Sequence, residues 1–166
     1  GSHGYALLER LVDHINGRAI VIADAKRGDI GNTSQQYARA VLDNMGCDAI
    51  TITPYLGRDA IEPFIKNPNK GVFILTVTSN PSARELQEHG GGADPLYKKV
   101  IQLAVELNTD DNIGLVVGAT QIEVMEDVRE RSKGMPWLIP GIGAQGGDLE
   151  TALNISHQNG MGIINI

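Results

Sequence analysis

Two acids and a lysine lie close together in one short stretch of the sequence. Asp24, Lys26 and Asp29 follow a continuous apolar run, Ala19 to Ala23, and glycines interrupt the chain around them. Such a run is typical of a strand buried on both faces. Residues two apart in an extended chain project to the same side, so Asp24 and Lys26 are expected to lie together at the strand end. An acid and an ammonium placed there can stabilise charge and move a proton; a solvated turn is the alternative interpretation.

The remainder of the chain alternates helices with strands. Apolar spacing predicts a helix over 5–15, and another from about Thr33 to Met45 with Asn32 or Thr33 as its N-cap. Further strands are predicted over 49–55, 71–79, 112–119, 136–140 and 161–166, with helices over about 57–66, 95–107, 121–133 and 148–159. This alternation predicts an α/β fold with a parallel sheet. The polar strand ends favour a barrel over a doubly wound sheet, and no Gly-x-Gly-x-x-Gly follows the first strand.

Composition limits the class of protein. With 166 residues, 42% of them hydrophobic and 20% charged, the chain is predicted to form a single globular domain over 4–166, preceded by a tag remnant over 1–3. A net charge of −6 argues against nucleic acid as a partner. The lone Cys47 excludes an internal disulfide and is expected to be buried. Neither a signal peptide nor a membrane-spanning run is recognisable, so a cytoplasmic location without a membrane partner is expected.

The decapeptide Asp24-Ala-Lys-Arg-Gly-Asp-Ile-Gly-Asn-Thr33 resembles the signature of orotidine 5′-phosphate decarboxylase, in the form typical of a bacterial branch of that family. The resemblance implies a (β/α)8 TIM barrel and a cofactor-independent carboxy-lyase that makes uridine 5′-phosphate (UMP) in pyrimidine biosynthesis. It implies that Lys26 stabilises negative charge at the pyrimidine C6 and protonates that carbon, while Asp24 lies against the substrate carboxylate. It also implies a homodimer with shared active sites, in which Asp29, Ile30 and Thr33 reach the partner's site.

Two later strand ends match the same family. Ser79 follows the third predicted strand, and its family counterpart contacts the polar edge of the pyrimidine; an ordinary Ser-Asn-Pro turn is the alternative. Pro140 opens a glycine-rich loop that ends at Asp148, where small residues let backbone N–H groups approach an anion. Gln145 matches the family's phosphate- and ribose-contacting glutamine, and a purely structural turn is the alternative for the loop. The resemblance therefore makes Ser79, Pro140 and Gln145 substrate-binding candidates.

The number of predicted strands falls short of a complete barrel. A TIM barrel has eight strands in roughly 250 residues, whereas about six parallel β/α units are predicted here. We therefore expect a partial barrel, a fragment that lacks both ends of the family's fold and is weakly active or inactive. No metal site is predicted, because His14, His89 and His157 lack metal-ligand spacing, and the resemblance implies that no other cofactor is needed. Two alternatives stay open: a metal-dependent sugar-phosphate decarboxylase or aldolase of the same suprafamily, and a non-catalytic folding or assembly fragment.

Overall fold

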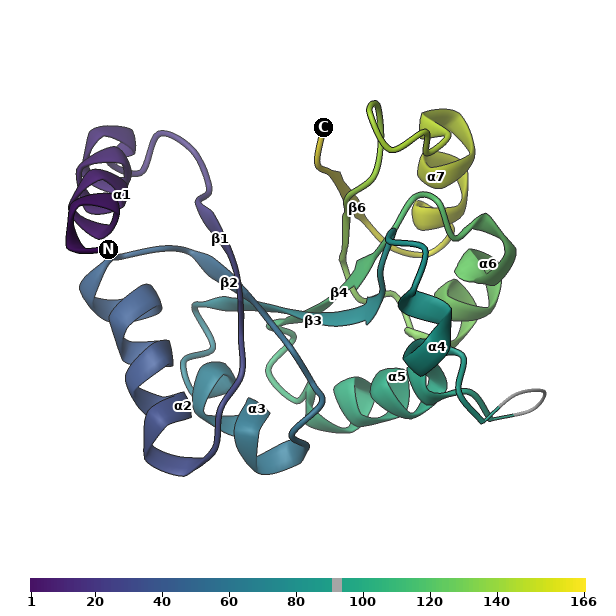
Figure 1. The fold of residues 1–166 in the computed structure, drawn as a ribbon, viewed down its shortest axis with the longest axis horizontal. Helices are drawn as coiled ribbons and strands as arrows, with labels where there is room; N and C mark the ends of the chain where they lie inside the picture. Colours follow the sequence, from purple (N-terminus) through teal and green to yellow (C-terminus); the bar gives the residue numbers. More distant parts are fainter. Residues whose placement is uncertain (91–93) are drawn as a thin grey trace. The chain divides into compact units, whose positions relative to one another are not determined.

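The computed structural model describes residues 1–90 and 94–166 (Figure 1). Residues 91–93, which fall in the connection predicted after the third strand, lie outside this description. The described residues form two compact units, 1–72 and 73–166, and the boundary falls inside strand β3. The single domain predicted over 4–166 stays a prediction.

The first unit carries the charged stretch on its first strand. Its elements are α1 (Ser2–Ile15), β1 (Ile22–Arg27), α2 (Gly31–Ala38), the π-helix η1 (Arg39–Asn44), β2 (Ala49–Ile52), α3 (Arg58–Ile65) and the start of β3 (Gly71–Val77). β1 and β2 pair in parallel, with Ala23 opposite Ile50. Helix α1 already includes Ser2 and His3. Two of the three residues interpreted as a tag remnant therefore belong to the first helix, and Gly1 is its N-cap.

The second unit repeats the strand–helix alternation. It holds the rest of β3, α4 (Ala83–Gln87), α5 (Leu96–Leu107), β4 (Ile113–Val117), α6 (Ile122–Arg131), β5 (Trp137–Ile139), α7 (Leu149–Ser156) and β6 (Gly162–Ile164). β4 pairs with β5, and β5 with β6, in parallel. The short helix α4 lies where the sequence predicted only a connection. Helix α7 begins where predicted, because the Asp148 carboxylate accepts a hydrogen bond from the Thr151 N–H at 2.6 Å.

Within the described residues, six strands form one sheet in the order β1-β2-β3-β4-β5-β6. The order in the sheet equals the order in the chain, and a helix connects each strand to the next. This connectivity is that of a (β/α)8 barrel, whereas a doubly wound sheet reverses its order at a switch point. The predicted fold class, a partial TIM barrel of six parallel β/α units, is confirmed.

Strand β1 differs from its prediction in position and in burial. The side chain of Ile20, in the middle of the predicted apolar strand, is 79% exposed. The strand begins at Ile22 and continues through the charged residues to Arg27, and none of its residues is fully buried. Among the strands that the structure describes, β1 stands at the end of the sheet order and has β2 as its neighbour. The prediction of a first strand buried on both faces is therefore wrong, because an edge strand is covered less completely.

The helix after the charged stretch begins earlier than predicted and has a different N-cap. Its N-cap is Ile30, which has an extended backbone and makes no side-chain capping hydrogen bond. Asn32 and Thr33 lie inside α2, so the prediction that one of them caps the helix is wrong. The predicted single helix to Met45 consists of α2 followed by the π-helix η1.

Each unit buries its own apolar strand. All four residues of β2 are buried in the first unit, and Phe64 of the neighbouring α3 is fully buried. All five residues of β4 are buried in the second unit, together with Met125 of α6 and Trp137 of β5. Cys47 is also buried, as predicted. The strands next to the candidate site are thus held by close-packed apolar neighbours.

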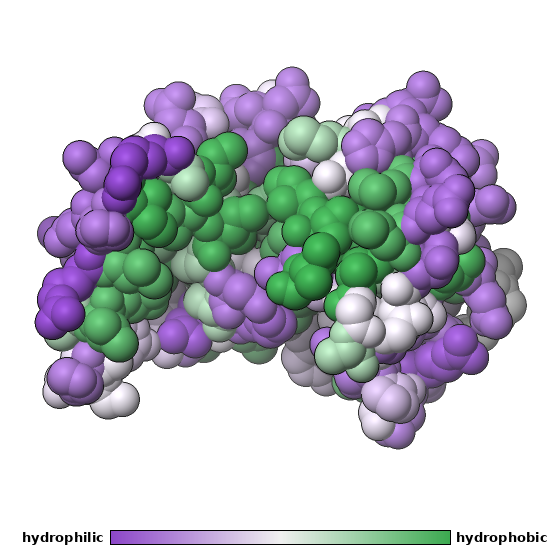
Figure 2. Space-filling model, turned by 90° about the horizontal axis from the view of Figure 1, so that it is seen from above, coloured by the Kyte–Doolittle hydropathy of each residue, from purple (hydrophilic) through white to green (hydrophobic). Residues whose placement is uncertain are grey.

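Helix α1 places apolar side chains on the surface. Tyr5, Leu7 and Leu11 are each more than half exposed, and the helix has no buried residue. In the view from above, hydrophobic surface lies beside hydrophilic surface (Figure 2). A polar contact joins this helix to β1, since Arg27 Nη2 donates to Tyr5 Oη at 3.1 Å. Like every other helix that the structure describes, α1 falls short of the length and apolar character needed to span a membrane.

Candidate active site

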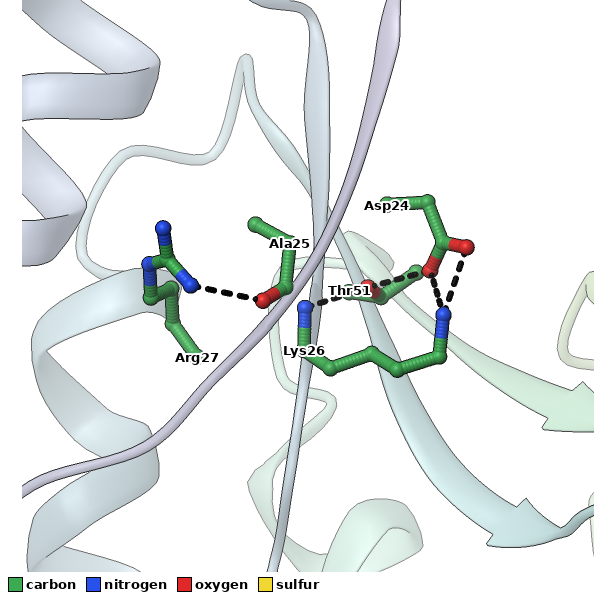
Figure 3. Close-up of polar contacts among 5 residues, drawn as sticks. All are labelled: Asp24, Ala25, Lys26, Arg27 and Thr51. Atoms are coloured by element: carbon green, nitrogen blue, oxygen red, sulfur yellow. Dashed lines mark hydrogen bonds and ion pairs between the residues drawn. The ribbon is translucent and has the colours of Figure 1, made fainter. Parts of the chain in front are cut away.

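Asp24 and Lys26 of β1 form an ion pair. Lys26 Nζ lies 2.6 Å from Oδ1 and 2.5 Å from Oδ2 of Asp24 (Figure 3). The Lys26 side chain is 51% exposed and that of Asp24 is 60% exposed, so both charged groups are accessible to a ligand. The structure therefore brings together the two side chains that the sequence predicted to meet.

The pair forms at an irregularity of β1. Four residue steps along β1, from Ala23 to Arg27, lie opposite two steps along β2, from Ile50 to Ile52. Within this bulge Lys26 has a φ of 47°, in the left-handed region that side-chain-bearing residues seldom adopt. The prediction that Asp24 and Lys26 meet rested on simple strand alternation. In the structure a bulge interrupts that alternation and changes the direction of the lysine side chain.

Thr51 of β2 contacts both members of the pair. Its side chain is fully buried, and its hydroxyl donates to Asp24 Oδ1 at 2.9 Å. The same oxygen accepts a hydrogen bond from the backbone N–H of Lys26, also at 2.9 Å. The sequence analysis missed this residue. The available signal was a hydroxyl in an otherwise apolar strand, because a buried hydroxyl requires hydrogen-bond partners.

The environment of Asp24 keeps its carboxylate ionised. Burial raises the pKa of this carboxyl group, but hydrogen bonds from Lys26 and Thr51, together with the charge of the ammonium, outweigh burial and hold the pKa below its ordinary value. The site therefore presents a negative and a positive group side by side at neutral pH.

The side chain of Arg27 lies on the opposite side of β1 from the ion pair (Figure 3). Its Nη1 donates to the Ala25 carbonyl at 3.0 Å, and its guanidinium lies 5.4 Å from the centre of the Tyr37 ring. These contacts anchor the strand against its own helix, so Arg27 acts here as a structural cation.

Asp29, Ile30 and Thr33 gather where α2 begins. The Asp29 carboxylate accepts a hydrogen bond from the N–H of Ile30 at 2.8 Å. Ile30 is 62% exposed, and Thr33 is exposed in the first turn of the helix. Their role toward a partner chain stays a prediction.

In the second unit the structure brings Ser79 and Gln145 together. Ser79 follows β3 and Gln145 lies in the loop after β5, and the Ser79 hydroxyl donates to Gln145 Oε1. Gly141 allows this approach, because a Cβ there would lie 3.1 Å from the Ser79 Cβ and its φ is +99°. Two candidates that are 66 positions apart in the chain thus share one polar contact.

The loop that Pro140 opens is held by backbone hydrogen bonds. The Pro140 carbonyl accepts from the Ala119 N–H, and the Gly147 N–H donates to the Gly141 carbonyl, both at 2.9 Å. At the end of the loop Asp148 caps α7, and the hydrogen bond from Thr151 lowers the pKa of its carboxyl group. A carboxylate therefore already occupies the positive end of this helix, and an anion bound at the loop would rely on backbone N–H groups of the loop itself.

Metal-ligating side chains are not gathered at either place. Within the described residues, no three His, Cys, Asp or Glu side chains are clustered so that they could hold a metal ion.

The fold and this pair define a TIM-barrel protein with an acid and a lysine exposed on one strand. Residues 2–163 match the orotidine 5′-phosphate decarboxylase / HUMPS family, and the chain belongs to that family. The orotidine 5′-phosphate decarboxylase of Dehalococcoides mccartyi is 48% identical over an alignment of 165 residues, which covers 96% of this chain and 61% of that protein. The corresponding protein of Haloarcula marismortui is 44% identical over 166 residues, covering 98% of this chain and 60% of its own length.

A solved structure agrees with these relatives. The OMP decarboxylase of Leishmania donovani superposes with a TM-score of 0.91 at 35% sequence identity, covering 100% of this chain and 66% of that one. The chain thus spans 60–61% of the length of these curated relatives.

Proposed function

We propose that this protein decarboxylates orotidine 5′-phosphate to uridine 5′-phosphate in pyrimidine biosynthesis. The observation that carries the proposal is the exposed Asp24–Lys26 ion pair on β1. It lies in a chain whose relatives are named orotidine 5′-phosphate decarboxylases. Those names do not favour the metal-dependent sugar-phosphate enzyme that the sequence left open.

Lys26 supplies the charge and the proton that the reaction needs. When the bond between C6 and the carboxylate breaks, carbon dioxide leaves and the electron pair stays on C6. An ammonium beside C6 stabilises this developing negative charge, and electrostatic stabilisation of this kind is usually the largest single contribution to catalysis. The ammonium then donates a proton to C6, which completes UMP, and the neutral amine regains its proton from solvent. No cofactor takes part in this scheme.

Asp24 acts in this scheme as an ionised neighbour of the substrate carboxylate. Its lowered pKa keeps it charged near neutral pH. Repulsion between two carboxylates is relieved when carbon dioxide leaves, although stabilisation of the carbanion is the main effect. Asp24 also holds the Lys26 side chain in place through their ion pair.

Ser79, Gln145 and the loop that begins at Pro140 all lie in the second unit. We assign the polar edge of the pyrimidine to Ser79, and the phosphate and ribose to Gln145 and the loop that begins at Pro140. The hydrogen bond between Ser79 and Gln145 supports this assignment, because it joins the two side chains proposed to contact one ligand.

The proposed assembly is a cytoplasmic homodimer with shared active sites. Asp29, Ile30 and Thr33 would complete the site of the partner, and the exposure of Ile30 and Thr33 leaves these side chains available for such a contact. The substrate is the small-molecule partner in this proposal.

The test is the loss of orotidine 5′-phosphate absorbance with the purified chain at high concentration. We expect weak turnover in the wild type and a loss of at least about a thousandfold in Lys26→Ala, because charge stabilisation and proton donation are both removed. Lys99→Ala is the matched control, since Lys99 is also exposed and faces a carboxylate, at 3.6 Å from Asp94. A chelator is expected to leave the rate unchanged, and inhibition by it would support the metal-dependent alternative. A folded wild type without turnover would contradict the proposal for this chain and favour a folding or assembly fragment.

A further inference from the structure

Thr51 is the one polar residue of the buried strand β2. Ala49, Ile50 and Ile52 complete this short strand, and all four residues are buried. A buried hydroxyl costs free energy unless it is hydrogen-bonded. Thr51 satisfies its hydroxyl through the neighbouring strand, where both partners belong to the Asp24–Lys26 pair (Figure 3).

The bulge in β1 explains why a side chain is needed at this point. The register between the two strands is interrupted between Ala23 and Arg27, and Lys26 lies inside the interruption. The backbone N–H of Lys26 donates a hydrogen bond to the Thr51 hydroxyl oxygen. Because Lys26 also has a φ of 47°, this hydrogen bond stabilises a backbone conformation that is intrinsically unfavourable.

A single orientation of the hydroxyl serves both contacts. The Thr51 proton points to Asp24 Oδ1, which leaves an oxygen lone pair for the N–H of Lys26. An ionised Asp24 suits this arrangement, since a carboxylate is purely an acceptor and its Oδ1 also accepts from Lys26 Nζ. The hydroxyl thus fixes the carboxylate of one partner and the backbone of the other, while their charged ends meet at 2.5 to 2.6 Å.

We propose that Thr51 is a positioning residue that holds the Asp24–Lys26 pair in its reactive geometry. The proposal rests on the proposed function, in which this pair carries the decarboxylation. Thr51 itself does not touch the substrate. From the buried strand β2 it contacts the Asp24 carboxylate and the Lys26 backbone. The ion pair alone would leave both exposed side chains free to rotate.

The electrostatics of Asp24 support this role. Burial raises the pKa of its carboxyl group, and the hydrogen bond from Thr51 is one of the causes that lower it. Removal of the hydroxyl therefore raises the pKa of Asp24. A side chain that merely filled space in β2 would have no such effect.

The test compares three variants of the whole chain. Thr51→Val removes the hydroxyl and keeps the shape, whereas Thr51→Ser keeps the hydroxyl and loses a methyl group. Thr76→Val is the matched control, because Thr76 is a buried strand threonine whose hydroxyl donates to the Ile74 carbonyl at 3.0 Å. Two readouts are used. The pKa of Asp24 is measured by carbon-13 NMR of its carboxyl group, and kcat and KM are measured for orotidine 5′-phosphate.

We expect Thr51→Val to raise the pKa of Asp24 and to lower kcat by about tenfold with little change in KM, since misplaced reacting groups reduce the chemical step. Thr51→Ser is expected to restore both quantities, and Thr76→Val to change neither. An unchanged Asp24 pKa in folded Thr51→Val overturns the proposal. So does an equal pKa rise in Thr51→Ser and Thr51→Val.

The two proposals fail separately in these experiments. A wild type without turnover refutes the proposed function, and the pKa comparison still decides the role of Thr51. If Thr51→Val does not fold, the wild-type hydroxyl proton decides it instead. This proton is expected to exchange slowly with solvent, and its NMR chemical shift is expected to change as Asp24 titrates. A Thr51 proton whose chemical shift stays constant through that titration overturns the positioning role.

Discussion

Arg129 of α6 is a buried cation whose removal is expected to destabilise the second unit. Its side chain is only 5% exposed. Nη1 donates to the Ser156 carbonyl at 3.1 Å, and Nη2 donates to the Ser132 hydroxyl at 2.7 Å and the Met135 carbonyl at 2.8 Å. The guanidinium also lies 4.4 Å from the centre of the Trp137 ring. One side chain thus joins α6 to the segment before β5 and to the end of α7.

The expected cost of Arg129→Met follows from these contacts. Two buried carbonyls lose a charged donor, at about 1–3 kcal/mol each, and loss of the cation–π contact adds about 1–2 kcal/mol. Burial lowers the pKa of the Arg129 guanidinium, and its Nε has no hydrogen-bond partner among the described residues, so removing the charge also recovers desolvation free energy. We expect a net loss of about 3 kcal/mol in the free energy of unfolding.

Urea unfolding followed by tryptophan fluorescence measures this loss in the second unit. Trp137 is the single tryptophan of the chain, so its signal reports on the unit that contains Arg129. With a urea dependence of about 1–3 kcal/mol per M, the midpoint falls by about 1–3 M. Arg131→Met is the matched control, because Arg131 pairs with Asp127 at 2.8 Å on the exposed side of the same helix, and we expect a cost below about 0.5 kcal/mol. An Arg129→Met chain as stable as the wild type would refute the reasoning and show that desolvation cancels the hydrogen bonds.

Two further predictions concern the candidate site. Gly141→Ala is expected to destabilise the chain by about 1–3 kcal/mol and more than Gly143→Ala; both glycines have positive φ, but only at Gly141 would a Cβ approach Ser79 and Gln145 within 3.1 to 3.4 Å. Urea unfolding of both variants checks this, and equal losses would show that the close approach is unimportant. The pKa of Asp24 is lower in the folded chain than in the unfolded chain. Its ionised carboxylate therefore contributes its full stabilisation to the folded state above the unfolded pKa, and this stabilisation is lost as the pH falls through the folded pKa. The stability difference between wild type and Asp24→Asn should therefore shrink between about pH 5 and pH 2, and a difference that stays constant with pH would contradict the assignment.

The order of helices and strands was predictable from the sequence because alternating apolar segments leave few topologies. The strand at 113–117 is buried throughout and that at 71–77 is mostly buried, and continuous apolar runs of this kind are the clearest signals of a parallel sheet. The first strand was misplaced for a physical reason. Ile20 is apolar but exposed, whereas Asp24 and Lys26 are charged yet belong to β1, since an edge strand accepts both.

The candidate site was predictable only as far as local spacing reaches. Asp24 and Lys26 are two positions apart, so their meeting could be expected from the strand itself. The contact between Thr51 and this pair depends on the register of two strands separated by 27 positions, which no local pattern encodes. The left-handed backbone of Lys26 was equally hidden, because lysine carries no preference for that conformation.

The energetics of this strand are better explained by function than by stability. An exposed ion pair such as Asp24–Lys26 contributes about 0–1 kcal/mol to folding. The left-handed conformation of Lys26 costs about 1–2 kcal/mol, and the bulge also interrupts the ladder with β2. A regular strand with a lysine in the ordinary conformation would therefore be at least as stable. Strained backbone persists where its surroundings enforce it. The strain at Lys26 therefore supports the two proposals above, in which Thr51 holds the Asp24–Lys26 pair in place and Lys26 acts in the reaction.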